Sequence, residues 1–175
     1  SRPGGELIQG SDGNFYGTTF AGTVPGDLGM IFKMTPTGVF TPLLSFYGSE
    51  GPLVEGVDGN LYGTTSRGGS SGAGTVFKVT TNGILTTLAS FNVANGSDPM
   101  AALTLGPDGN FYGTTRNGGS GGVGTSGGGT VFLMTPSGTL STLASFPSYF
   151  GVGTNAIGSF LQGGLTLGND GNLYS

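Results

Sequence analysis

The 175 residues carry nine acidic and five basic side chains, and the formal charge of −4 argues against nucleic acid or an anionic membrane surface as a partner. The chain has no histidine and no cysteine, which excludes histidine-based acid–base catalysis, the usual zinc sites and disulfides. Glycine supplies 39 residues without a collagen-like period of three, so we interpret the glycines as turn residues between apolar runs.

Fourteen short β-strands and no helix are predicted, because the apolar runs are short, rich in Thr, Val, Phe, Tyr and Leu, and bounded by Gly, Pro, Asn and Asp. In chain order the predicted strands are 6–9, 14–19, 30–35, 39–46, 53–56, 60–65, 75–80, 84–91, 102–105, 110–115, 130–135, 139–146, 164–167 and 172–175. They form three groups of four and a final pair.

Each group contains one copy of the stretch Asp-Gly-Asn-Phe-Tyr-Gly-Thr-Thr or a close variant, and the final pair begins a fourth copy. The copies start at Asp12, Asp58, Asp108 and Asp170, so the chain is a tandem array. Asp-Gly links the first strand of each group to the second, and it is a strong hairpin signal because glycine accepts a positive φ. Pro-x-Gly or Asn-Gly links the third strand to the fourth. Each repeat is therefore predicted to be a four-stranded antiparallel meander.

Both faces of a predicted sheet carry apolar side chains, because Phe77 and Val79 point to one face while Val76 points to the other. Such a sheet needs a neighbour on each face, and sheets stacked around an axis provide one. We therefore predict an all-β fold, namely a single partial β-propeller of three full four-stranded blades and a half blade over residues 1–175. The expected blades are about 1–47, 48–93 and 94–147, followed by an insertion at 147–163 and the half blade at 164–175.

The recurring Asp-Gly pairs are interpreted as structural turns, in which the aspartate accepts backbone N–H bonds and the glycine takes a positive φ. The aspartates lie a blade apart, which is too far for a catalytic carboxylate pair; a calcium role stays open as the alternative. We predict no catalytic residue, no metal and no cofactor. The turn residues are Asp12, Gly13, Asp58, Gly59, Asp108, Gly109, Asp170 and Gly171. The following tyrosines, Tyr16, Tyr62, Tyr112 and Tyr174, are predicted to pack between blades, with sugar stacking as the alternative.

Four charged residues are expected on the rim that carries the longest connections, 117–129 and 147–163. Arg67 and Arg116 are taken as equivalent positions just after Thr-Thr, while Glu50 and Asp98 lie in connections between repeats. Either these residues form bridges between neighbouring loops, or they line a polar pocket for a sugar or a peptide. The long loops mark either an interaction face or neutral lengthening of glycine-rich segments.

The pattern Leu-Thr-Leu-Gly-x-Asp-Gly-Asn-Phe-Tyr-Gly-Thr-Thr, then Gly-Gly, then Gly-Thr-Val-Phe-Lys-x-Thr-Pro-x-Gly-x-Leu-x-Thr-Leu-x-Ser-Phe, resembles the glycine-rich tandem repeats of the Gloeo/Verruco family. It is more distantly similar to the blades of NHL-type propellers. The resemblance covers nearly the whole chain. It implies that the first strand of each blade lines the axis and the fourth lies outermost, and it implies a secreted or envelope-associated setting but no reaction. Lys33 and Lys78 have Leu133 as their counterpart, which argues against a ring of identical ligand sites.

We therefore expect a non-enzymatic extracellular or cell-surface propeller of the bacterial envelope, acting as a structural scaffold or protein interaction module. The alternative is a lectin-like module that binds carbohydrate on the rim of long loops. The expected partners are further blades of a longer chain or copies of the chain itself, together with a glycan or a surface protein. No nucleic acid is expected. Nor is a membrane span, because no apolar run approaches the roughly 18 residues that a spanning helix needs.

Overall fold

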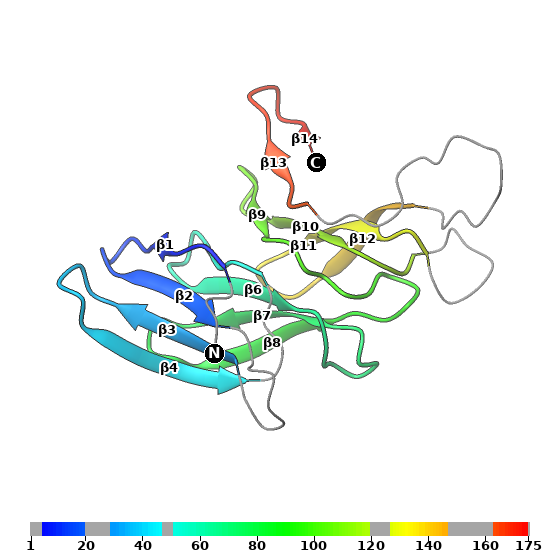
Figure 1. Ribbon diagram of the computed structural model, residues 1–175. Coiled ribbons are helices and arrows are strands. Elements are labelled where there is room, and N and C mark those ends of the chain that lie inside the picture. Colours follow the sequence, from blue (N-terminus) through cyan, green and yellow to red (C-terminus); the bar gives the residue numbers. More distant parts are fainter. Residues whose placement is uncertain (1–4, 20–28, 47–50, 120–126, 147–162, 175) are drawn as a thin grey trace.

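The computed structural model describes residues 5–19, 29–46, 51–119, 127–146 and 163–174, and within these ranges it contains fourteen strands and no helix (Figure 1). The predicted all-β class is confirmed. The first strand of each repeat has two residues rather than the predicted four, because its ladder to the second strand contains only two residue pairs.

The strands form three four-stranded antiparallel sheets and one hairpin, each in chain order. The first sheet contains β1 (Ile8–Gln9), β2 (Phe15–Thr19), β3 (Gly29–Met34) and β4 (Phe40–Phe46). The second sheet contains β5 (Val54–Glu55), β6 (Leu61–Thr65), β7 (Thr75–Val79) and β8 (Leu85–Ser90). The third sheet contains β9 (Thr104–Leu105), β10 (Phe111–Thr115), β11 (Thr130–Met134) and β12 (Leu140–Ser145). The C-terminal hairpin contains β13 (Thr166–Leu167) and β14 (Leu173–Tyr174).

The three sheets share one register. In the second sheet Tyr62 pairs with Lys78 and Gly63 with Phe77, and the other two sheets repeat these pairings with their counterparts. Each sheet also has a register shift at the same place between its third and fourth strands, at Val76/Phe77 in the second sheet. The repeats are therefore equivalent in hydrogen bonding as well as in sequence.

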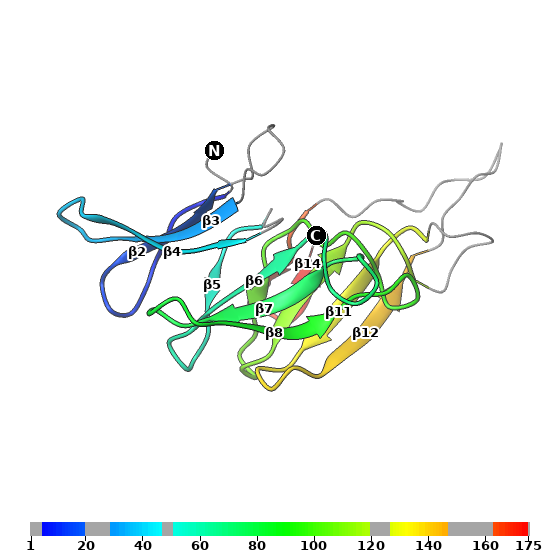
Figure 2. The same cartoon turned by 90° about the horizontal axis from the view of Figure 1, so that it is seen from below.

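Successive sheets pack face to face, in the order of the chain (Figures 1 and 2). Val76 belongs to the apolar cluster between the second and third sheets, while Phe77 and Val79 belong to the cluster between the first and second. The two faces of β7 are thus both buried, as the alternation of its side chains predicts. The rings of Phe91 and Phe132 meet edge to face across the second interface, with centroids 5.0 Å apart.

The first strands lie at one side of this stack and the fourth strands at the other. Strands β5 and β9 contact each other, and the hydroxyl of Thr104 in β9 donates a hydrogen bond to the carbonyl of Leu165, just before β13. The fourth strands β8 and β12 are instead largely exposed. The connections and turns between strands consequently gather on two opposite rims, which is where the candidate residues lie.

Candidate functional site

All four Asp-Gly-Asn turns have the same hydrogen-bond geometry. In each, one carboxylate oxygen of the aspartate accepts the backbone N–H of the asparagine two residues later, at 3.0–3.1 Å. The other oxygen accepts the side-chain amide of that asparagine, at 2.7–2.8 Å. The glycine between them has a φ of 72° to 80°, which an L-residue with a side chain rarely adopts. The aspartate therefore fixes a turn whose backbone only glycine tolerates without strain.

A tyrosine four residues after each aspartate donates its hydroxyl to the same carboxylate, at 2.7–2.9 Å. Sequence reasoning missed this contact, although the fixed Asp-to-Tyr spacing was its signal. At Asp58, burial opposes ionisation, but the hydrogen bonds from Asn60 and Tyr62 outweigh it and lower the pKa. The pKa of Asp170 falls to about 2, chiefly through the hydrogen bond from Tyr174. Burial, followed by the bond to the carboxylate, raises the pKa of Tyr62 well above its ordinary value.

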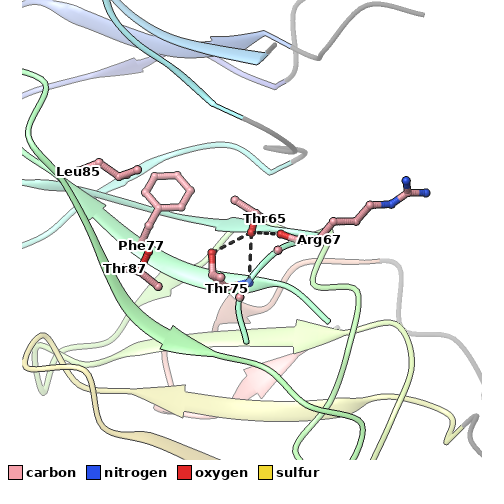
Figure 3. A pocket seen from close by; sticks show the side chains of 8 residues that line it. Thr65, Arg67, Thr75, Phe77, Leu85 and Thr87 are labelled. Carbon is pink, nitrogen blue, oxygen red and sulfur yellow. Dashed lines mark hydrogen bonds between the residues drawn. The ribbon is translucent and has the colours of Figure 1, made fainter. Parts of the chain in front are cut away.

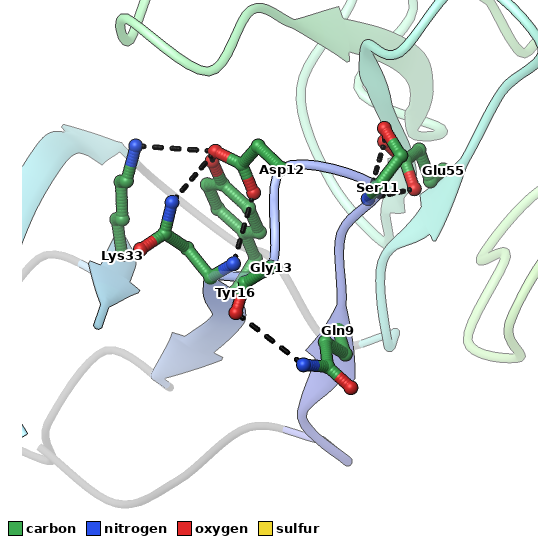
Figure 4. A network of polar contacts seen from close by, with 8 residues as sticks. Gln9, Ser11, Asp12, Gly13, Tyr16, Lys33 and Glu55 are labelled. Atoms are coloured by element: carbon green, nitrogen blue, oxygen red, sulfur yellow. Dashed lines mark hydrogen bonds and ion pairs between the residues drawn. The ribbon is translucent and has the colours of Figure 1, made fainter. Parts of the chain in front are cut away.

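The first turn has further contacts, which Figure 4 shows, among them a 3.3 Å hydrogen bond from the side chain of Gln9 to the carbonyl of Gly13. Lys33 places its Nζ 3.3 Å from Oδ2 of Asp12. Glu55 on β5 accepts the backbone N–H of Ser11 at 2.8 Å and its hydroxyl at 2.7 Å, which ties this turn to the second sheet. In the third sheet Leu133 takes the place of the lysine. The turns thus share their hydrogen bonds but differ in whether a lysine lies beside the carboxylate.

The carboxylates of these turns are occupied by donors from their own repeat. Among the residues that the structure describes, no group of three or more His, Cys, Asp and Glu side chains is arranged to hold a metal ion. Hard cations such as calcium take six to eight oxygen ligands, so one such turn offers too few. The arrangement suits a structural role, because the carboxylate accepts the backbone N–H of the turn and also fixes the orientation of the tyrosine ring.

On the opposite rim, the connection between the second and third sheets is hydrogen-bonded to both. Ser97 and Asn117 exchange two backbone hydrogen bonds of 2.8 and 3.0 Å. Asp98 donates its N–H to Ala73 of the second sheet, and its carbonyl accepts the N–H of Arg116 from the third. Asp98 also has a φ of 60°, the only positive value among the described non-glycine residues. This residue therefore joins two loops of successive sheets.

The structure brings together two of the four charged rim residues. Nη1 of Arg116 lies 3.8 Å from Oδ2 of Asp98, in a pair that is partly exposed. A partly exposed ion pair contributes on the order of 0–1 kcal/mol to stability. The backbone hydrogen bonds of Asp98 and Arg116 therefore hold the two loops together more than the ion pair does. Arg67 is exposed and forms no ion pair with a carboxylate of the described part of the chain. Glu50 lies outside the described residues.

The predicted equivalence of Arg67 and Arg116 is wrong. The hydroxyl of Thr65 donates to the carbonyl of Arg67, and that of Thr115 donates to the carbonyl of Asn117. Arg67 is thus the counterpart of Asn117, and Arg116 stands one position earlier. Aligning the two repeats on their Thr-Thr pairs also places Arg67 opposite Asn117, and the threonine hydrogen bonds to these two carbonyls confirm that alignment.

One open cavity adjoins Arg67, and another adjoins the turn at Asp108. A cavity of about 170 Å³ lies on the face of the second sheet that is turned to the first, near Arg67 (Figure 3). Its lining includes Thr65, Arg67, Gly69, Thr75, Phe77 and Thr87. A second cavity, of about 340 Å³, lies between the turn of the third sheet and the C-terminal hairpin, beside Asp108, Tyr112 and Leu173. The first combines a cation with hydroxyl groups, which suits a polar ligand.

The tyrosines differ in burial along the array. Tyr16 and Tyr62 are fully buried, Tyr112 is half-buried, and Tyr174 is 55% exposed. Tyr16 and Tyr62 therefore pack between successive sheets, whereas Tyr174 has no sheet beyond it among the described residues.

No helix in the described part of the chain is long and apolar enough to cross a membrane. Compared with known protein families, residues 1–175 match the model described as the Gloeobacter/Verrucomicrobia repeat. No curated protein matches the chain.

Proposed function

Because the chain belongs to the Gloeobacter/Verrucomicrobia repeat family, we propose that its sheets are blades of a β-propeller that serves as a non-enzymatic scaffold or protein interaction module. We place this propeller outside the bacterial cell or on its surface. The low share of charged residues, 8%, and the abundance of Gly, Thr and Ser support such a setting.

One observation carries the proposal: successive sheets meet through equivalent residues. Tyr62 of the second sheet packs on Phe111 of the third, with ring centroids 4.1 Å apart. Their counterparts one repeat earlier, Tyr16 and Leu61, lie in one apolar cluster. The contact between β5 and β9, with β8 and β12 largely exposed, favours sheets that converge on the side of their first strands. Sheets arranged in this way suit a ring of blades.

The C-terminal hairpin presents the same interface without a cover. Tyr174 is exposed where Tyr62 is buried under the next sheet. Large apolar faces are rarely left in water, so a neighbouring sheet is the natural cover. We propose that further blades of a longer chain supply it, with copies of this chain as the second route.

The residues of the recurring sites support a scaffold rather than an enzyme. The four turn carboxylates are held by hydrogen bonds from their own asparagine and tyrosine. Without histidine or cysteine, chemistry would depend on carboxylates brought close together. The turns belong to separate sheets, which is the arrangement of a repeated structural element.

The mass of the purified chain in solution tests the assembly. Sedimentation velocity is expected to give a mass above the 17.3 kDa of one chain, because the open faces associate. Tyr174→Lys should lower that mass, since it puts a charge on the open interface while leaving Asp170 a partner. Leu143→Lys, on the exposed outer strand β12, is the matched control and should change nothing. A stable 17.3 kDa monomer that Tyr174→Lys does not alter contradicts the propeller.

The setting is tested separately, on intact cells that produce the protein. A reagent that cannot cross membranes is expected to label Lys33 or Lys78 without lysis. Labelling only after lysis would refute a role at the surface.

A further inference from the structure

The rim surface of the third sheet is filled by the chain itself. Residues 93–96, from the connection between the second and third sheets, lie on it. Gly119 donates its N–H to the carbonyl of Val93 at 2.9 Å, and Thr130 donates its hydroxyl to the carbonyl of Asn95 at 3.1 Å. Gly96 approaches so closely that a Cβ there would lie 2.6 Å from the Thr130 hydroxyl. A peptide segment with two accepting carbonyls and a glycine thus fits this surface.

The same surface of the second sheet is open, and it is the cavity beside Arg67. Thr65 and Thr75 hold their hydroxyls 2.8 Å apart, as Thr115 and Thr130 do in the third sheet. The ladder register also makes Thr87 the counterpart of a threonine in β12, Thr142. None of the hydrogen bonds within the described part of the chain engages the N–H of Gly69, which is the counterpart of Gly119. The cavity therefore has the same hydrogen-bond donors as the surface of the third sheet that binds residues 93–96.

The lengths of the connections explain the difference. Nine residues, 92–100, separate Phe91 from Ala101, and they include the filling segment. Four residues, 47–50, separate the corresponding Phe46 and Gly51. The shorter connection lacks five residues of the longer one, so its length leaves no room for an equivalent of the filling segment.

The positive charge of Arg67 favours an acidic occupant of the cavity. In the third sheet Asn117 donates its side-chain amide to the carboxylate of Asp98 at 3.4 Å. Arg67 stands at the position of Asn117 in the second sheet, and a carboxylate opposite it would gain a cation as its partner. A peptide that ends in Gly-Ser-Asp, as residues 96–98 do, would fit this cavity: its glycine could approach the threonine hydroxyls closely, and its aspartate would face the charge of Arg67.

The geometry points to a docking site: the cavity of the second sheet binds an acidic, glycine-containing loop of a partner protein, in the way that residues 93–98 bind the third sheet. This inference rests on the proposed function as an interaction module and names its site and its ligand chemistry. The loop 92–98 of another copy is not the expected occupant, because it is already bound to its own third sheet.

The probe is the synthetic peptide Asn-Val-Ala-Asn-Gly-Ser-Asp, the sequence of residues 92–98, added to the intact chain in an amide-proton NMR titration. We expect a saturable shift of the Gly69 amide, while the Gly119 amide, already bonded, stays in place. A peptide with alanine for its glycine should bind at least about tenfold more weakly, since a Cβ would meet the threonine hydroxyls.

Protein variants locate the site. Arg67→Ala should weaken binding up to about fivefold, because it removes one exposed charge pair. Thr87→Val should weaken it as well, whereas Thr142→Val, the same change in the filled third sheet, is the matched control and should not. Replacing residues 47–50 by the sequence of 92–100 should fill the cavity and abolish binding.

No saturable shift at Gly69 in the wild-type chain, or binding that neither Arg67→Ala nor the loop replacement changes, overturns the inference. So does a glycan array with hits that Arg67→Ala removes while the peptide does not bind, because the cavity is then a carbohydrate site. The mass measurement separates these failures from the proposed function. Association that depends on Tyr174 without peptide binding defeats only the docking site, whereas a monomer defeats the propeller itself.

Discussion

The hydroxyl of Tyr62 donates a 2.9 Å hydrogen bond to Oδ2 of Asp58, so a fully buried ring and an ionised carboxylate four residues earlier share one contact. The ring also packs on Phe111 of the next sheet. A turn at the rim and an interface between sheets are thus held by the same side chain. Stability should therefore respond to changes at either end of this contact.

Tyr62→Phe keeps the ring and removes the hydrogen bond. We expect it to lower the free energy of unfolding by about 1–2 kcal/mol, because the carboxylate of Asp58 loses a charge-assisted partner. Tyr174→Phe is the matched control, with an expected change of less than about 0.5 kcal/mol because water replaces an exposed donor. Urea denaturation measures both, and equal effects would show that burial of the ring does not strengthen the contact.

Acid should destabilise the fold through the turn aspartates. Their pKa values are lowered in the folded state from an ordinary value of 3.8, to about 2 at Asp170. A group with a depressed folded pKa contributes stability that is present above its unfolded pKa and is lost as the pH falls through the folded one. We expect the free energy of unfolding to level off above about pH 5 and to fall from about pH 4 downward. Asp58→Asn should make that slope shallower, and an unchanged slope would contradict the role of the turn.

Alkali should act through the buried tyrosines. The pKa values of Tyr16 and Tyr62 are raised above the ordinary 10.0, first by burial and then by the bonded carboxylates. A raised folded pKa contributes stability that is present below the unfolded pKa and is lost as the pH rises through the folded one. In an ultraviolet titration, we expect these two phenols to remain protonated at about pH 11 in the folded chain and to ionise near pH 10 in urea. Normal titration of every tyrosine in the folded chain would refute this.

Two glycines of the second sheet separate backbone strain from packing. A Cβ on Gly59 meets nothing within 4 Å, but its φ is 72°, so Gly59→Ala should cost about 1–2 kcal/mol through conformation alone. Gly59→Asn should cost less, because asparagine tolerates this region. A Cβ on Gly63 would lie 2.6 Å from the ring of Phe77, so Gly63→Ala overpacks the core and should cost about 1–3 kcal/mol. The combination Gly63→Ala with Phe77→Leu should recover part of that loss in urea denaturation, and a wholly additive loss would argue against the clash.

Strands, turns and the alternation of faces were predictable from the sequence. The Asp-Gly links, the glycine after each Pro-x pair and the alternation of Val76 with Phe77 are preferences of a few adjacent residues. The repeats also made the equivalence of the sheets visible, including Leu133 in the place of Lys78. What remained hidden within the turns was the bond from Tyr62 to Asp58, because propensities describe the backbone and not the direction of a side chain.

The sequence by itself determined that this chain forms repeated antiparallel meanders with two apolar faces, because those features depend on neighbours along the chain. Only the tertiary structure decided that residues 93–96 fill one rim surface of the third sheet while the corresponding surface of the second sheet stays open. Such contacts depend on the lengths of connections and on where the next sheet packs. The distance between groups remote in sequence is set by the fold as a whole, and no local pattern records it.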